Sequence, residues 1–228
     1  MAKSLCIIPA RGGSKRIPKK NIKEFHGQPI IAYSIQNALN SDMFHKVMVS
    51  TDCPEIKEVS LEYGADVPFL RSASNADDFA TTVDVVNEVL SNFRDLGLNF
   101  EKVCVLYPCA PFVGEKDLQV ASEMLDSYDG VVPVVKFDFP PLRSFKLAGP
   151  FLRYKWPEYQ KARSQDLEDL YHDAGQWYFF KNSEHQHVSM IKDRTAPLLL
   201  DALRVQDIDT MEDWKMAELK YQILRESL

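Results

Sequence analysis

The sequence predicts an α/β protein with a three-layer core, in which a mainly parallel sheet is flanked by helices. Two observations lead to this prediction. Short apolar runs typical of buried strands alternate with segments of helical periodicity over the first 135 residues. The chain has 228 residues, of which 45% are hydrophobic, and this is enough for one large domain with an extensive core. Strands separated by helices imply right-handed crossovers, which make the strands parallel.

Four strands are expected in the first part of the chain, at residues 5–9, 46–50, 102–107 and 130–135. Apolar residues at helical spacing predict four helices, which contain Ile31, Ile35, Ala38 and Leu39; Ile56, Val59 and Tyr63; Val85, Val86, Val89, Leu90 and Phe93; and Leu118, Ala121 and Leu125. Asp52 with Glu55 is expected to cap the second of these helices, and Gly64 to end it.

The pattern changes after residue 136. Residues 137–173 are rich in aromatics, prolines and charges and show no crossover pattern. They predict an excursion from a core made of residues 1–136 and 174–228, and clustered aromatics favour a contact between subunits there. The core is expected to resume with strand-like residues 176–180 and 198–208, and a last helix to begin at Thr210.

Bulk composition excludes several classes of protein. The chain carries 27 Lys+Arg against 33 Asp+Glu, a net charge of −6, which argues against a nucleic-acid binder. No apolar run approaches the roughly 18 residues that span a bilayer, and the first strand leaves no room for a signal peptide, so we expect a cytoplasmic protein. The four cysteines show no paired spacing and are expected to be buried thiols. His185 and His187 lack a third ligand nearby and are expected in a solvated loop.

A run of cations follows the first predicted strand and surrounds the pair Gly12-Gly13. Its members are Arg11, Lys15, Arg16, Lys19 and Lys20. Glycines leave backbone N–H groups free to point at anions, and Lys and Arg side chains bind phosphate. The spacing fits neither a Walker A loop nor a dinucleotide fingerprint. A solvated basic turn and a nuclear address are the alternatives, but the order of strand, glycine pair and cations favours a polyphosphate-binding loop.

Asp207-Ile208-Asp209-Thr210 is the second motif with chemical content. Alternating carboxylates at the end of a strand would point the same way, with Ile208 turned to the core. Two such oxygen ligands suit Mg²⁺, which usually takes its other ligands from substrate phosphate and water. The alternative is that Asp209 or Thr210 only caps the last helix. Together with a cationic loop, the pair favours the metal.

Ligands of such sheets bind beyond the carboxyl ends of the strands. The loop at residues 11–21, the turn at 50–52 and the turn at 107–111 are expected to converge there. In this order the motifs at residues 8–21, 50–52, 71 and 207–210 resemble the cytidylyltransferases of nine-carbon α-keto acid sugars, whose best-known members are the CMP-sialic acid synthetases. Residues 107–112 and 163–176 resemble the bacterial branch that acts on pseudaminic acid.

The resemblance implies the Rossmann-like fold of nucleotide-diphospho-sugar transferases. It also implies a reaction in which the anomeric hydroxyl of the sugar attacks the α-phosphorus of CTP and pyrophosphate leaves. It further implies a homodimer in which the excursion reaches the partner's site, so that residues 137–173 contribute to the sugar site.

The resemblance also implies roles for individual residues. Ala10, Arg11, Gly12, Gly13, Ser14, Lys15, Lys20 and Asn21 match the triphosphate motif, and Arg71, Ala80 and Thr82 match positions that hold cytosine and ribose. Asp207 and Asp209 match its Mg²⁺ ligands, and Arg11, Lys20 and Asp209 are the expected catalytic residues. Tyr107, Arg143, Arg163, Gln165 and His172 are the expected sugar contacts.

Departures from the pattern refine this expectation. Arg16 replaces a glycine common after that lysine. Tyr107 stands where sialic acid enzymes often carry glutamine, and Ser164 and His172 fall near positions where they use arginine. The last three changes argue against sialic acid as the sugar, and the resemblance favours pseudaminic acid, activated for surface glycan or flagellin glycosylation. The alternatives are legionaminic acid, sialic acid or Kdo as substrate, and a non-catalytic nucleotide-binding protein.

Overall fold

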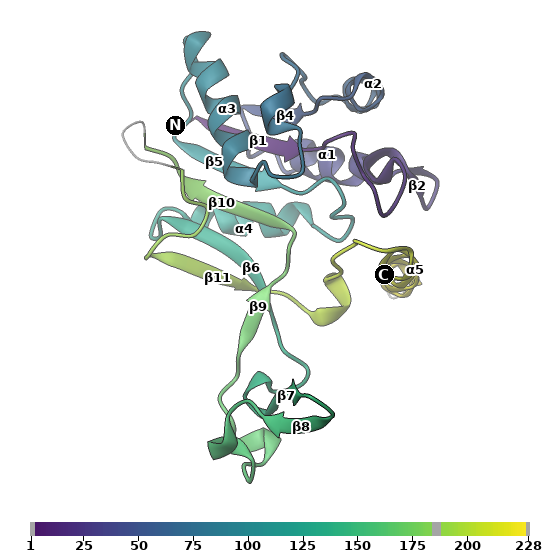
Figure 1. The fold of residues 1–228 in the computed structure, drawn as a ribbon. Helices are drawn as coiled ribbons and strands as arrows, with labels where there is room; N and C mark the ends of the chain where they lie inside the picture. The colour runs from purple at the N-terminus through teal and green to yellow at the C-terminus, as the bar shows by residue number, and fades with distance from the viewer. Residues whose placement is uncertain (1–2, 184–187, 227–228) are drawn as a thin grey trace.

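The computed structural model describes residues 3–183 and 188–226. At its centre is a seven-stranded sheet with the order β11-β6-β10-β5-β1-β4, in which β9 also pairs with β6 (Figure 1). The strands are β1 (Ser4–Pro9), β4 (Lys46–Ser50), β5 (Lys102–Leu106), β6 (Gly130–Lys136), β9 (Tyr171–Asp173), β10 (Trp177–Lys181) and β11 (Thr195–Leu199). The four strands expected in the first part of the chain are confirmed to within about one residue at each end.

Five strands share one direction, and β9 and β10 run against them. The pairs β1–β4, β1–β5 and β6–β11 are parallel, whereas β10 is antiparallel to both β5 and β6. The mainly parallel sheet is therefore confirmed, with two antiparallel members. Their direction follows from connectivity: the chain leaves the sheet at the carboxyl end of β6 and returns through β9, antiparallel to β6, without a crossover.

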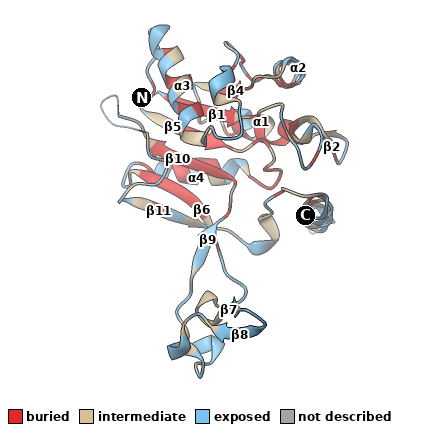
Figure 2. Ribbon diagram, in the orientation of Figure 1, coloured by how far each residue is buried: buried red, intermediate tan, exposed pale blue. Residues whose placement is uncertain are grey.

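Helices cover both faces of the sheet, which confirms three layers. Alternate residues of a strand face opposite sides: Cys6 and Ile8 pack in one apolar cluster with α1, α2 and α4, whereas Leu5 and Ile7 pack in another with α3. The strands β1, β4, β5, β6 and β10 are accordingly the most buried part of the molecule (Figure 2). The helices are α1 (Ile30–Asn40), α2 (Pro54–Glu62), α3 (Thr82–Asp95), α4 (Glu115–Met124) and α5 (Met211–Glu226).

A third apolar cluster lies beside the sheet and joins the two ends of the chain. Ile17, from the loop after β1, and Ile208, just before α5, are both buried in it, together with Trp214 of α5. Phe25 of the small hairpin β2 (Glu24–Phe25) and β3 (Gln28–Pro29) completes its centre. This cluster fixes the cationic loop next to the Asp-Ile-Asp motif, although the two are far apart in sequence.

Residues 137–170 form a small unit that projects from the carboxyl end of β6 (Figure 1). Its only regular sheet within the described residues is the hairpin of β7 (Phe145–Ala148) and β8 (Phe151–Tyr154). Large apolar side chains are open to solvent here, and Phe139 and Leu147 are 86% and 81% exposed. The unit therefore has an apolar surface that a single chain does not cover.

Two local predictions are wrong. The strand expected at residues 198–208 is β11 at Thr195–Leu199, and residues 200–209 are not a strand, because the chain leaves the sheet through the short 3-10 helix Ala202–Arg204. Asp52 does not cap α2, whose N-cap is Cys53; the Asp52 carboxylate instead accepts a hydrogen bond from the N–H of Gly12. Gly64 does follow that helix with a positive φ of 91°.

His185 and His187 lie outside the described residues. The four cysteines are free thiols; Cys6 and Cys104 are buried, as expected, whereas Cys53 and Cys109 are partly exposed. None of the helices in the described part of the chain is long and apolar enough to cross a membrane.

Candidate active site

The cationic loop begins where β1 ends and is held against the turn after β4. Ala10 is fully buried, and its N–H donates to the carbonyl of Ser50 at 2.9 Å. The N–H of Gly12 donates to Oδ1 of Asp52 at 2.9 Å. A Cβ atom at Gly12 would lie only 2.8 Å from the Cβ of Cys53, so a side chain does not fit between the two turns. A Cβ at Gly13 would meet nothing within 4 Å.

Asn21 ties the two halves of the loop together. Its side chain is buried, and Nδ2 donates to the carbonyl of Arg11 at 2.9 Å. Its Oδ1 accepts from the thiol of Cys109 at 3.4 Å. Both polar groups of the Asn21 amide thus have partners within the protein, and the bond to the carbonyl holds the backbone of Arg11 in place.

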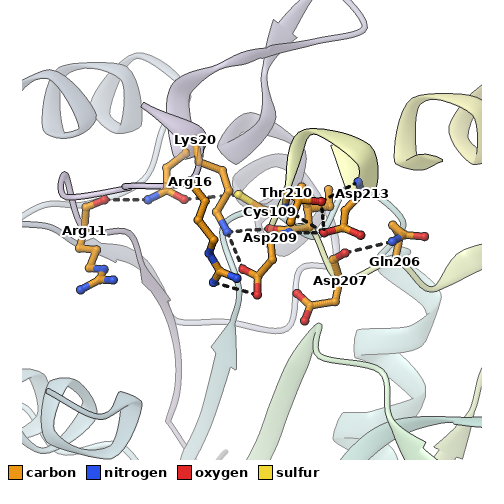
Figure 3. A network of polar contacts seen from close by, with 11 residues as sticks. Arg11, Arg16, Lys20, Cys109, Gln206, Asp207, Asp209, Thr210 and Asp213 are labelled. Atoms are coloured by element: carbon orange, nitrogen blue, oxygen red, sulfur yellow. Dashed lines mark hydrogen bonds and ion pairs between the residues drawn. The ribbon is translucent and has the colours of Figure 1, made fainter. Parts of the chain in front are cut away.

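The loop meets the Asp-Ile-Asp motif directly, as Figure 3 shows. The ammonium of Lys20 donates to the carbonyl of Ile208 at 2.7 Å and lies 3.5 Å from Oδ1 of Asp209. The Nη2 atom of Arg16 lies 2.9 Å from Oδ2 of the same carboxylate. Two loop cations therefore share Asp209.

Capping of α5 is carried by residues other than the twin acids. Thr210 Oγ1 accepts from the N–H of Asp213 at 3.2 Å, and Oδ2 of Asp213 accepts from the N–H of Thr210 at 2.8 Å. The same Oδ2 accepts from the N–H of Asp209 at 3.1 Å. The carboxylates of Asp207 and Asp209 are left to line the cavity beside the loop.

These two carboxylates suit a divalent cation. Burial and then the nearby charge of Asp209 raise the pKa of Asp207, and Lys20 opposes the shift only in part. A cation bound between the two carboxylates would relieve both effects, because it offsets the burial and the repulsion of the charged forms. Among residues 3–183 and 188–226, no group of three or more His, Cys, Asp or Glu side chains could hold a metal. Mg²⁺ typically binds one or two protein carboxylates and takes its remaining ligands from phosphate oxygens and water.

Three cavities adjoin one another at this edge of the sheet, and Tyr107 lines all three. The central one has a volume of about 540 Å³ and holds the loop cations and the twin acids. A smaller one of about 220 Å³ lies beside α3, and a larger one of about 730 Å³ lies toward the excursion. Besides Tyr107, the central cavity is lined by seven of the expected residues: Arg11, Ser14, Lys15, Lys20, Asn21, Asp207 and Asp209. The small cavity is lined by Arg71, Ala80 and Thr82, and the large one by His172.

Arg71 is buried at the small cavity and held by the end of β4. Its Nη2 donates to the carbonyl of Ser50 at 2.5 Å and its Nε to the hydroxyl of Ser50 at 3.1 Å. Burial lowers the pKa of Arg71, and the carboxylates of Asp52 and Glu88 oppose this. A guanidinium so fixed is suited to hydrogen-bond a planar polar group in that cavity.

Comparison with known proteins supplies the family. A family model described as "Cytidylyltransferase" matches residues 5–224. The chain belongs to the cytidylyltransferase family. It is 40% identical over 229 residues, 99% of each chain, to a protein named pseudaminic acid cytidylyltransferase in Campylobacter jejuni strain 81-176. It is 33% identical to a CMP-N,N'-diacetyllegionaminic acid synthase of Legionella pneumophila, over 98% of each chain.

Solved structures share the fold of this cytidylyltransferase. The structure of CMP:2-keto-3-deoxy-manno-octonic acid synthetase complexed with CTP superposes with a TM-score of 0.67 at 15% identity, covering 99% of this chain and 100% of that one. A 4-diphosphocytidyl-2C-methyl-D-erythritol synthase from Anaerococcus prevotii gives 0.67 at 14% identity, over 97% of this chain and 96% of that one. Both confirm the nucleotidyltransferase fold expected from the sequence.

The expected sugar contacts of the cytidylyltransferase are only partly brought together. Tyr107 and His172 both line the large cavity, where the His172 ring packs 4.7 Å from that of Phe137. Arg143 instead donates to the hydroxyl of Ser164 at 3.2 Å within the excursion. Gln165 lines a separate cavity of the excursion, and Arg163 is exposed there. Within one chain, neither these two nor Arg143 line the three adjoining cavities.

Sequence reasoning missed several contacts that arrange the site of the cytidylyltransferase. Arg16 was expected only as one of the loop cations, and Cys109 only as a thiol in the turn at residues 107–111; their contacts with Asp209 and Asn21 were not expected. Asp78, which pairs with both Arg11 and Lys15, had no distinguishing signal, because an acid in a polar loop is common. Asp213, three residues after Thr210, carries the signal of a capping pair and could have been found.

Proposed function

We propose that this cytidylyltransferase transfers the cytidylyl group of CTP to pseudaminic acid, forming CMP-pseudaminic acid and pyrophosphate for surface glycan or flagellin glycosylation. One observation carries the chemistry: the cations of the loop and the acids Asp207 and Asp209 line one cavity, where Arg16 and Lys20 contact Asp209. The choice of sugar is supported by the near full-length similarity to the Campylobacter jejuni relative.

The three cavities have the order that this reaction needs. The triphosphate belongs in the central cavity, among Arg11, Lys15 and Lys20. Cytosine and ribose belong in the small cavity beside Arg71, and the acid sugar in the large one beside His172. Tyr107 borders all three, close to where the α-phosphate would meet the sugar hydroxyl.

The chemistry is an in-line displacement at phosphorus. The anomeric oxygen of the sugar forms a bond to the α-phosphorus and loses its proton, while the bond to the bridging oxygen breaks and pyrophosphate leaves with the electron pair. The protein contributes positioning and charge compensation. Lys20, anchored by the carbonyl of Ile208, and Arg11, anchored through Asn21, stabilise charge on the departing pyrophosphate.

Asp207 and Asp209 are proposed to hold Mg²⁺, because they offer two adjacent hard oxygen donors in the central cavity, called the phosphate cavity below. When bound, the ion supplies neutralisation of phosphate oxygens and orientation of the leaving group.

Pyrophosphate release from purified protein tests the assignment. CTP, UTP and ATP are each combined with pseudaminic, legionaminic and sialic acid and with Kdo, with and without Mg²⁺. We expect the highest kcat/KM for CTP with pseudaminic acid, and only in the presence of Mg²⁺. Preference for another acid sugar would keep the reaction and change the substrate. CTP binding without release for any sugar would indicate a non-catalytic nucleotide-binding protein.

A homodimer is part of the proposal, since the excursion exposes apolar side chains that need a cover. Phe151 and Leu152 on β8 are each 64% exposed. Pairing of two excursions would bury them and bring Arg143, Arg163 and Gln165 toward the partner's sugar cavity. In sedimentation analysis, Phe151→Asp should give monomers, whereas Leu61→Asp, at a 50% exposed site on α2, should not. A wild-type monomer would contradict this part.

We place the reaction in the bacterial cytoplasm, where CTP is made.

A further inference from the structure

Arg16 belongs to the phosphate cavity but has no role in the reaction as described so far. Its guanidinium lines that cavity, and its Nη2 lies 2.9 Å from Oδ2 of Asp209. The Arg16 side chain is 65% exposed, so packing does not hold it in this position.

Lys20, the other cation on Asp209, is anchored differently. Its ammonium donates at 2.7 Å to the carbonyl of Ile208, and its side chain is only 22% exposed. Lys20 therefore keeps its hydrogen bond to the carbonyl of Ile208 when Asp209 binds a different cation. The only ion pair found for Arg16 in the described part of the chain is the one with Asp209. The two cations on one carboxylate thus differ in mobility.

A cation bound by Asp209 would displace Arg16. Both oxygens of this carboxylate face side-chain cations, Oδ1 toward Lys20 and Oδ2 toward Arg16. A divalent ion competes for these oxygens and repels the guanidinium, which is free to swing because it is mostly exposed. The anion then available in the same cavity is the polyphosphate, and a planar guanidinium binds phosphate through two parallel hydrogen bonds.

We propose that Arg16 is a further catalytic residue, which leaves Asp209 when substrate binds and contacts the departing pyrophosphate. The inference rests on the proposed function, because it takes pyrophosphate as the leaving group. It assigns Arg16 no covalent step: the residue compensates charge on pyrophosphate oxygens as the bond to the α-phosphorus breaks.

The alternative is an exposed ion pair with Asp209 and no contact with substrate. Such pairs contribute little to stability, so removal of Arg16 would then leave both folding and turnover unchanged. The two readings differ in one direct quantity, the affinity of the protein for pyrophosphate.

The variants are Arg16→Ala and Arg16→Lys, with Lys19→Ala as the matched control. Lys19 was expected among the phosphate-binding cations of the loop, but it pairs with Glu55 at 2.6 Å and does not line the cavity, so the structure removes it from that set. Its side chain is 65% exposed, as is that of Arg16. Thermal unfolding of all three variants should match wild type.

Pyrophosphate binding is measured by calorimetry in the presence of Mg²⁺ and without CTP or sugar, so that no turnover takes place. Arg16→Ala should weaken binding roughly tenfold or more, the loss typical of one charge-assisted hydrogen bond. Arg16→Lys should recover part of the affinity, and Lys19→Ala should equal wild type. Equal affinity of wild type and Arg16→Ala would overturn the proposal.

Steady-state kinetics add a second readout. We expect Arg16→Ala to reduce kcat by about 10- to 100-fold, within the range for a lost electrostatic donor, with an unchanged KM for the sugar. Its Mg²⁺ half-saturation should fall, because the guanidinium no longer competes for Asp209; a rise would overturn the displacement step. If wild-type protein released no pyrophosphate with any sugar, the proposed function would fail, while calorimetry would still judge Arg16.

Discussion

The Nη1 atom of Arg11 lies 2.9 Å from Oδ1 of Asp78, and this ion pair lies between the two cavities proposed for one nucleotide. Arg11 and Asp78 line both cavities. Lys15 pairs with the other oxygen of the same carboxylate. Two of the loop cations are therefore neutralised by an internal acid in the free protein, and a triphosphate has to take the place of Asp78.

Replacing that acid should strengthen nucleotide binding. In Asp78→Asn, Arg11 and Lys15 no longer exchange one anion for another, so we expect the KM for CTP to fall roughly two- to fivefold, in line with a modest exposed ion pair, with kcat little changed. Asp66→Asn removes a pair with Lys46 outside the cavity and serves as the control. A higher KM in Asp78→Asn would show that Asp78 instead helps to position Arg11.

Loss of either member of the Lys20–Asp209 pair should impair turnover. We expect Lys20→Ala and Asp209→Ala each to lower kcat by about two orders of magnitude or more, the effect of removing one preorganised electrostatic group. Asp209→Ala should also lose its dependence on Mg²⁺. Glu212→Ala, at an exposed position in the first turn of α5, should behave as wild type. Near-normal pyrophosphate release by Asp209→Ala would remove this residue from the mechanism.

Thr210 should matter for stability and far less for chemistry. Its hydroxyl accepts from the N–H of Asp213 and so caps α5. Thr210→Ala is expected to lower the free energy of unfolding by about 1 kcal/mol, as for other lost N-caps, which urea denaturation would measure. Thr210→Ser keeps the hydroxyl and is the matched control. A large loss of kcat with unchanged stability would contradict the separation of capping from catalysis.

Cys109 should resist alkylation although it borders the phosphate cavity. Burial raises the pKa of its thiol to about 12. The thiolate is the reactive form, and a raised pKa keeps the thiol protonated until the pH approaches that value. At pH 8, iodoacetamide should leave Cys109 unmodified in peptide mass spectrometry, whereas the unfolded protein in guanidinium should react there. Comparable reaction rates in the two states would refute the burial argument.

Local patterns predicted the sheet and helices well, because each depends on nearby residues. The alternation of Leu5, Cys6, Ile7 and Ile8 between two apolar clusters follows from strand geometry alone. Asp52 shows the limit of such local patterns. Its position before α2 fits a helix cap, but its carboxylate accepts a hydrogen bond from the N–H of Gly12, which is remote in sequence. The antiparallel β10 likewise depends on where the excursion returns the chain.

For the site, residue types and their order indicated a phosphate loop and a pair of metal-binding acids. Sequence could not show which cation meets which acid, because such pairs join residues far apart in the chain. Lys20 meets Asp209 only because Ile17 and Ile208 are buried in the same apolar cluster. The pairing of Asp78 with Arg11 and Lys15 had no local signal at all.

The chain by itself determined the elements of the fold, the kind of ligand and the family, since periodicity, glycine placement and the types of charged residue are local properties. Only the tertiary structure decided how the charges are shared: Asp78 with Arg11 and Lys15, and Asp209 with Arg16 and Lys20. The physical reason is that ion pairing depends on distance in space, and apolar packing between remote segments sets that distance.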